Sequence, residues 1–271
     1  MKSITLIACF VFSCTFFKVQ GVDTDAFFAK YPGNSYQDIN ICNEIFPTGT
    51  DLCSNRYDLI KPILNALNKP FNVLDLGAAQ GYFSFSIAHD YPNSSCVMID
   101  ANTSYYSNHG NILYDLCHLN SHLKNICYLN KKMALSDLSI LKKEAHFDII
   151  FAMLVVHMMA DSLIEQIKII NSLLELGDNL ILEVSNNVAP FLFEYVALLS
   201  EKVDCECLGE VIRHRVEFCP YHYETCPCTG KLYWFKKKSP DRKSLSSHAP
   251  LGITEETFIK FNGVYPDYKP S

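Results

Sequence analysis

The sequence predicts an α/β protein built on a seven-stranded, mostly parallel sheet with helices on both faces. Between residues 56 and 238, short apolar segments of strand length alternate with longer amphipathic segments, which is typical of parallel strands joined by helices. The last two strand-like segments have no helix between them, so we expect an antiparallel hairpin at one edge. The chain has 271 residues, 49% of them apolar, which suits one domain with a sizeable core.

The first half of this region begins with a helical segment. Residues 56–67 place Leu59, Ile63 and Leu67 on one helical face, and Pro62 should kink this helix or mark its start. Beyond it, strand-length apolar runs that end near Gly or polar residues alternate with helical segments, although the Phe and Ser content of the first such helix also allows a strand. The expected elements are strands 71–77, 95–101 and 125–131 and helices 82–91 and 104–123.

The second half contains the clearest helix of the sequence, residues 160–176. Its apolar face is formed by Leu163, Ile167, Ile170, Leu173 and Leu174. The other segments are apolar runs of strand length and one further helical stretch. The expected elements are strands 146–154, 178–185, 205–212 and 231–237 and helix 189–202.

The remaining segments lie outside this domain. Residues 1–21 carry an apolar run after a single basic residue, which we interpret as a cleavable signal peptide that exports the protein to a periplasm or out of the cell. The apolar run, residues 4–17, is short for a bilayer span, but a membrane anchor there or a lipidated Cys14 is an alternative; no other run predicts a transmembrane segment. We expect 22–55 to be an irregular N-terminal lead-in or lid and 239–271 to be a C-terminal tail.

A glycine-containing turn follows the first strand of the predicted sheet. Its pattern is Asp75-x-Gly77-x-Ala79-x-Gly81. Glycines let the backbone approach a ligand closely, and the following helix presents its N-terminus. A dinucleotide fingerprint would need glycine at positions 77, 79 and 82, and this chain has Ala79 and Tyr82 at the last two. The turn therefore predicts a cofactor site of another kind.

The stretch "VLDLGAAQGYFSFSIA" resembles motif I of the class I S-adenosylmethionine-dependent methyltransferases. Asp100, at the end of the second strand, resembles the acid that follows in that family, and "FDIIFAMLVVHMM" and "LLELGDNLILEVS" resemble its later motifs. The resemblance covers residues 56–238 and implies a Rossmann-like methyltransferase fold with S-adenosyl-L-methionine as cofactor. It also implies that Asp75 holds the cofactor's ammonium group, directly or through water. A carboxylate such as that of Asp100 accepts hydrogen bonds from the ribose hydroxyls.

The resemblance leaves the adenine end of the site open. The segment "NKKMALSDLSIL" corresponds to the family's adenine-contacting region, which makes Ser136 and Asp137 candidate contacts. For Asp137, a solvated loop acid is an equal alternative. The turn residues Gly77, Ala79 and Gly81 complete the predicted cofactor-binding set.

The predicted catalytic residue is His157, which follows the fourth strand. Enzymes of this type often hold a residue near the methyl group at that place, and a histidine near its usual pKa can act as a general base. The alternative is a histidine that opens the next helix and packs there. Glu183, Ser185 and Asn186 end the fifth strand, where they either bind substrate or cap the strand end.

Cysteines crowd into an insertion at about residues 205–230. They are Cys205, Cys207, Cys219, Cys226 and Cys228. With a signal peptide upstream, disulfides are the favoured interpretation. Zinc held with His214 and His222 and free thiols are the alternatives, and the Cys-x-Cys spacings fit zinc poorly, so no metal site is predicted. A further bridge between Cys42 and Cys53 is possible.

The predicted function is methyl transfer to an unidentified acceptor, most simply an oxygen on a small molecule or a glycan. An RNA methyltransferase is one alternative, since "NRYDLIKPIL" and "LILEVSNN" faintly resemble the bicoid-interacting RNA-cap enzymes. A net charge of −6 disfavours nucleic acid as a partner. A catalytically silent, exported binding module on the same fold is the other alternative, because S-adenosylmethionine is a cytoplasmic metabolite.

Overall fold

The computed structural model describes seven ranges of the chain, and the following account is confined to them. The ranges are 23–33, 35–49, 52–101, 112–186, 188–200, 204–212 and 229–236. The expected signal peptide, the C-terminal tail and Cys219, Cys226 and Cys228 lie outside these residues. Within them, no helix is long and apolar enough to cross a membrane.

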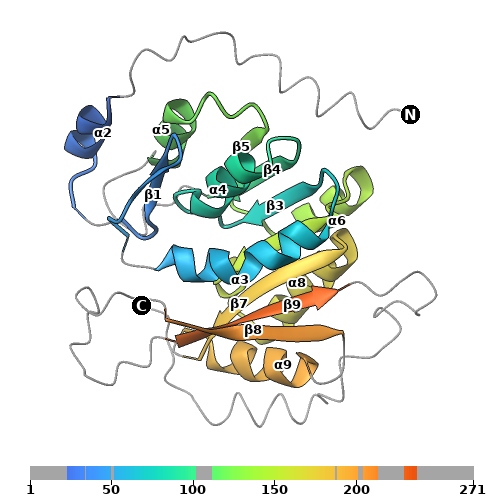
Figure 1. Ribbon diagram of the computed structural model, residues 1–271. Helices are drawn as coiled ribbons and strands as arrows, with labels where there is room; N and C mark the ends of the chain where they lie inside the picture. The colour runs from blue at the N-terminus through green and yellow to red at the C-terminus, as the bar shows by residue number, and fades with distance from the viewer. Residues whose placement is uncertain are drawn as a thin grey trace.

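The predicted seven-stranded sheet is present, with the strand order β5-β4-β3-β6-β7-β9-β8. The five strands from β5 to β7 pair in parallel, and β9 pairs antiparallel with both β7 and β8. This confirms the mostly parallel sheet with an antiparallel hairpin at one edge (Figure 1). The strands are β3 Asn72–Leu76, β4 Ser95–Asp100, β5 Ile126–Asn130, β6 Ile149–Met153, β7 Asn179–Ser185, β8 Cys205–Ile212 and β9 Thr229–Lys236.

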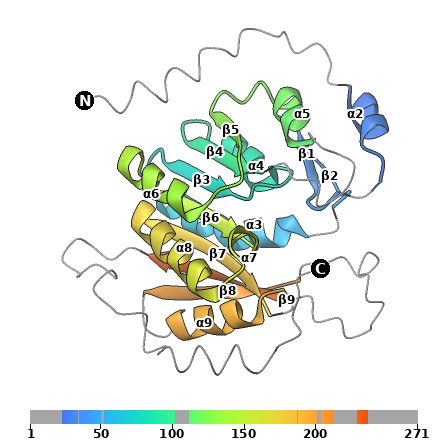
Figure 2. The same cartoon turned by 180° about the vertical axis from the view of Figure 1, so that it is seen from behind.

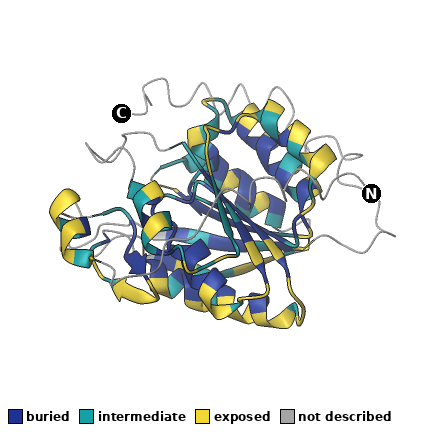
Figure 3. Cartoon of the chain, turned by 90° about the horizontal axis from the view of Figure 1, so that it is seen from above, coloured by how far each residue is buried: buried dark blue, intermediate teal, exposed yellow. Residues whose placement is uncertain are grey.

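Helices cover both faces of the sheet, as Figures 1 and 2 show from opposite sides. On one face lie α3 Cys53–Ala66, α4 Tyr82–Asp90 and α5 Ile112–Leu119; on the other lie α6 Leu135–Glu144, α8 Leu163–Leu176 and α9 Pro190–Ser200. The strands between the two layers are largely buried (Figure 3). Side chains alternate between the faces along β3: Val73 packs with α3 and α4, whereas Leu74 packs with α8.

Helices α3 and α6 differ from the expectation in ways that the packing explains. Helix α3 starts at Cys53 and runs through Pro62 because Ile60, Ile63 and Leu64 bury one face completely or almost so, which offsets the lost hydrogen bond at the proline. Helix α6 occupies the segment expected only to contact adenine. Its N-terminus is stabilised by Asp137, which accepts a hydrogen bond from the Ala134 N–H at 2.9 Å.

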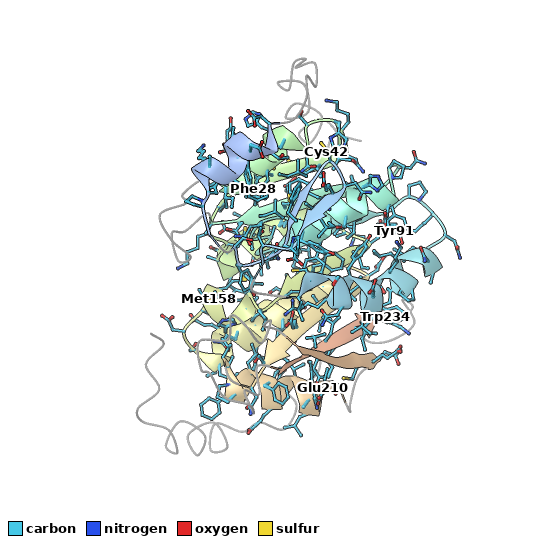
Figure 4. All side chains as sticks on the ribbon, turned by 60° about the vertical axis from the view of Figure 1, so that its left-hand side comes forward. Phe28, Cys42, Tyr91, Met158, Glu210 and Trp234 are labelled. Carbon is cyan, nitrogen blue, oxygen red and sulfur yellow. The ribbon has the colours of Figure 1, made fainter. Side chains whose placement is uncertain are left out.

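The N-terminal lead-in, residues 22–55, is more regular than expected. It contains α2 Thr24–Lys30 and an antiparallel hairpin of β1 Ile39–Ile41 and β2 Glu44–Phe46. The hairpin turns at Cys42 and Asn43, both with positive φ, as a two-residue turn requires. The strands are only three residues long, so their alternation is too short to recognise in the sequence. Phe28 of α2 and Cys42 lie toward one end of the molecule, away from Trp234 and Glu210 (Figure 4).

The cysteine predictions can be compared with the structure in part. Cys42 and Cys53 are not joined, since neither takes part in a disulfide, and the suggested bridge is therefore wrong. Cys42 lies at the exposed hairpin turn, whereas Cys53 is buried at the start of α3. Cys205 and Cys207 of β8 also carry thiols rather than a disulfide, so the described part of the chain gives no support to a stapled insertion.

Candidate cofactor site

The glycine turn lies at the carboxyl end of β3, between β4 on one side and β6 on the other. Gly77, Ala79 and Gly81 all have positive φ, at 75°, 52° and 76°. The Gly77 N–H donates to the carbonyl of Ile99 at 2.8 Å, which holds the turn against β4. The chain runs from β3 to β4 on one side of the sheet and from β6 to β7 on the other, so the connections diverge between β3 and β6. In open α/β sheets, ligands bind at such a switch point.

The turn is also held against the loop that follows β6. A Cβ atom at Gly77 would lie 2.4 Å from Cγ2 and 2.7 Å from Cβ of Val155. Real Cβ atoms do not approach other atoms so closely, so only glycine fits this position. The residue before Val155, Leu154, has φ 55°, and this left-handed conformation directs the chain across the turn.

Replacing Gly77 with alanine should lower the free energy of unfolding by about 2–4 kcal/mol, because backbone strain and overpacking add. Urea unfolding would measure the loss. Gly33→Ala is the matched control, since Gly33 also has positive φ (97°) but no atom within 4 Å of the added Cβ. Gly33→Ala should therefore lose only the backbone contribution, about 1 kcal/mol. Equal losses in the two variants would show that the contact with Val155 does not constrain the turn.

Asp100 ends β4 beside the glycine turn. Its Oδ2 accepts a hydrogen bond from the Ala79 N–H at 2.9 Å, and its carbonyl accepts from the Lys131 N–H at 2.9 Å. One carboxylate has about four acceptor positions, so the bond to Ala79 does not by itself exclude hydroxyl donors. The geometry therefore fits the predicted ribose contact at the mouth of the turn.

Asp75 lies beneath the turn and is 3% exposed. Its Oδ2 accepts a hydrogen bond from the Ser84 hydroxyl at 2.7 Å. Burial raises the pKa of Asp75 to about 7; the Ser84 hydrogen bond lowers this pKa and the charge of Asp100 raises it. Neither of these two neighbours supplies a positive charge, so a cation bound nearby would stabilise the ionised carboxylate.

Ser136 and Asp137 lie on α6 and play different parts. Ser136 is exposed. Both oxygens of Asp137 are engaged, one by the Ala134 N–H and the other by Lys131 Nζ at 2.6 Å. The Lys131 hydrogen bond and then that of Ala134 lower the pKa of Asp137. Asp137 therefore has a structural role at the helix start, and an adenine contact by either residue stays a prediction.

His157 lies on the short helix α7 Val156–Met159, directly after the loop that contacts Gly77. Its side chain is half-buried. The connection through Val155 brings this helix to the same edge of the sheet as the glycine turn (Figure 2). That location suits a group acting near the cofactor, and its role as a base stays a prediction.

Glu183 of β7 forms a buried ion pair that the sequence did not indicate. Arg56 Nε lies 2.9 Å from Glu183 Oε2, and Arg56 Nη2 donates to Oε1 at 3.2 Å. Both side chains are at most 2% exposed. Gly230 of β9 leaves room for the pair, because a Cβ there would lie 2.8 Å from Glu183 Oε1. Glu183 is therefore engaged with α3 rather than open to a substrate, and Ser185 is also buried.

The fold is that of the class I S-adenosylmethionine-dependent methyltransferases. One similar solved structure is the bifunctional kinase-methyltransferase WbdD, with a TM-score of 0.53, 20% identity, and coverage of 79% of this chain and 46% of WbdD. This chain thus spans about half the length of WbdD. Another is the N-terminal domain of EvdMO1 with SAH bound, with a TM-score of 0.52, 11% identity, and coverage of 79% and 95%. No protein-family model and no curated protein matches the sequence.

Proposed function

We propose that this protein is an S-adenosylmethionine-dependent methyltransferase. The observation that carries the proposal is the hydrogen bond between Asp100 and the Ala79 N–H, which puts an acceptor for ribose hydroxyls on the glycine turn. The buried Asp75 beneath the same turn supplies an acid for the ammonium group. Similarity to WbdD, described as a kinase-methyltransferase, and to the SAH-bound EvdMO1 domain supports this proposal.

The residues of the site suit a reaction in which the protein mainly positions two reactants. When bound, S-adenosylmethionine supplies the electrophilic methyl group of a sulfonium. Asp100 would hold the ribose hydroxyls and Asp75 the ammonium group, with the backbone from Gly77 to Gly81 against the cofactor. The cofactor would give up its methyl group and leave as S-adenosylhomocysteine, and an imidazole nitrogen of His157 would take the proton of the acceptor hydroxyl.

We infer that the acceptor is an oxygen on a small molecule or a glycan. An RNA acceptor is less consistent with the formal net charge of −6, because phosphate binding requires clustered Lys and Arg. The apolar N-terminal segment supports export of the protein, or its anchoring by residues 4–17. Export would separate the protein from cytoplasmic S-adenosylmethionine, so a silent binding module is the alternative outcome that the following experiment addresses.

Calorimetric titration of the purified full chain with S-adenosylmethionine and with SAH tests the proposal. We expect binding by the wild type and an affinity about 10–100-fold lower in Asp100→Asn, which keeps an acceptor for Ala79 but loses charge-assisted bonds to the ribose. Asp148→Asn is the control, because Asp148 precedes β6 at the opposite end of the sheet and bonds Lys69 and Asn72. A folded wild type that binds neither ligand would refute the enzymatic function.

A further inference from the structure

Helix α4 starts at the glycine turn without a capping side chain of its own. Its N-cap residue is Gly81, which has no side chain to accept a hydrogen bond. The first N–H groups of a helix have no partner within the helix, and buried N–H groups without partners are costly. Gly81 and Tyr82 are both buried, so the start of α4 requires an acceptor from elsewhere.

That acceptor is Gln37, from the lead-in segment. Its Oε1 accepts hydrogen bonds from the Gln80 N–H and the Tyr82 N–H, both at 3.2 Å. In return, Gln80 Oε1 accepts from the Gln37 N–H at 2.9 Å. Gln37 and Gln80 are 6% and 7% exposed. Each of the two side chains therefore accepts a hydrogen bond from the backbone N–H of the other residue. This buried pair, the Gln37–Gln80 clamp, holds the glycine turn at Gln80.

The backbone of Gln37 is itself fixed by the lead-in. The Ser35 hydroxyl donates to the Gln37 carbonyl at 2.5 Å, and Gly49 packs so closely that a Cβ there would lie 2.4 Å from the Gln37 carbonyl carbon. The hairpin between these residues lies against α4 and α5 (Figures 1 and 2). The direction of the Gln37 side chain is thus set before any ligand binds.

We propose that Gln37 is a positioning residue of the cofactor site, an inference that rests on the proposed function. By holding the N–H groups of Gln80 and Tyr82, it fixes the turn in which the Ala79 N–H points at Asp100. The lead-in is then part of the site's architecture, not only a cover for it. Without this clamp the turn loses its fixed shape, and cofactor binding must restore that order.

Titration of SAH into three variants of the full chain tests this role. Gln37→Met removes the acceptor at similar size, and we expect its dissociation constant to rise about tenfold or more, since two buried N–H groups lose their partner. Gln37→Glu retains an acceptor oxygen at a helix N-terminus and should bind within about threefold of the wild type. Asn40→Ala is the matched control: it removes a hairpin bond to Ser86 of the same helix, at 3.1 Å, without touching the turn.

Hydrogen exchange adds a measurement that does not depend on a ligand. The amides of Gln80 and Tyr82 should exchange faster in Gln37→Met but not in Asn40→Ala. If Gln37→Met binds SAH like the wild type, or if Asn40→Ala loses as much affinity, Gln37 does not position the turn and the inference is overturned alone. If the folded wild type fails to bind SAH, the proposed function fails, and the cofactor role of Gln37 fails with it.

Discussion

Replacing Arg56 with methionine should lower the free energy of unfolding by about 3–5 kcal/mol. Arg56 and Glu183 are at most 2% exposed and face each other through two contacts, at 2.9 and 3.2 Å. The variant leaves the Glu183 carboxylate buried without its countercharge. Arg56 then no longer offsets the cost of removing the Glu183 carboxylate from water, and this cost accounts for most of the expected loss.

Denaturant unfolding of the wild type, Arg56→Met and a double variant would show whether the uncompensated charge of Glu183 causes the loss of stability. The double variant Arg56→Met/Glu183→Met should recover most of the lost stability, since apolar side chains of similar volume often replace a buried ion pair without penalty. The difference in free energy of unfolding between the double and the single variant measures the cost of burying the Glu183 charge without Arg56. A single variant within about 1 kcal/mol of the wild type, or a double variant no more stable than the single one, would contradict this account.

Asp75→Asn should change stability and cofactor affinity in opposite directions. The pKa of Asp75 is raised from 3.8 to about 7 by burial, so between these values the native state keeps a proton that the unfolded chain releases. The free energy of unfolding of the wild type therefore falls as pH rises from about 4 to about 7, then levels off. The amide of the Asp75→Asn variant does not titrate, and this variant should be about 2–4 kcal/mol more stable than the wild type at pH 8.

The same substitution should weaken binding of S-adenosylmethionine about 10–100-fold, because the ammonium group loses its countercharge. In the wild type, affinity should rise with pH up to about 7 as Asp75 ionises. Unfolding curves and calorimetry at about pH 5, 6, 7 and 8 would measure both effects. Ser84→Ala, which removes the hydrogen bond that lowers the pKa of Asp75, should move both pH dependences upward. An Asp75→Asn variant that loses stability at pH 8 would contradict the burial argument.

Much of the fold could be predicted from local sequence patterns. The alternation of apolar runs with helical segments predicted the order of the seven sheet strands along the chain, since burial on both faces of a parallel sheet makes each strand a short apolar run. The absence of a helix between β8 and β9 in the expected element order predicted the antiparallel edge. The placement of β9 between β7 and β8 did not follow from the pattern, because pairing partners are chosen by the packing of the whole sheet.

The candidate site likewise contains residues that the sequence indicated and one, Gln37, that it did not. The glycine turn was recognisable because a strand end followed by glycines leaves a mark within a few positions, whereas Asp75 and Asp100 were named through the resemblance to the methyltransferase motifs. Gln37 carried no such mark: it lies 43 positions before Gln80 in a polar segment of ordinary composition. A buried polar residue can be recognised only once its burial is known.

By itself, then, the sequence determined the fold class and the glycine turn, because these depend on short-range periodicity and on backbone conformations that only certain residues adopt. Only the tertiary structure decided what holds that turn in place. The Gln37–Gln80 clamp and the Arg56–Glu183 pair join positions 43 and 127 residues apart. No local pattern marks such buried contacts, because their partners meet only when folding brings distant parts of the chain together and removes them from water.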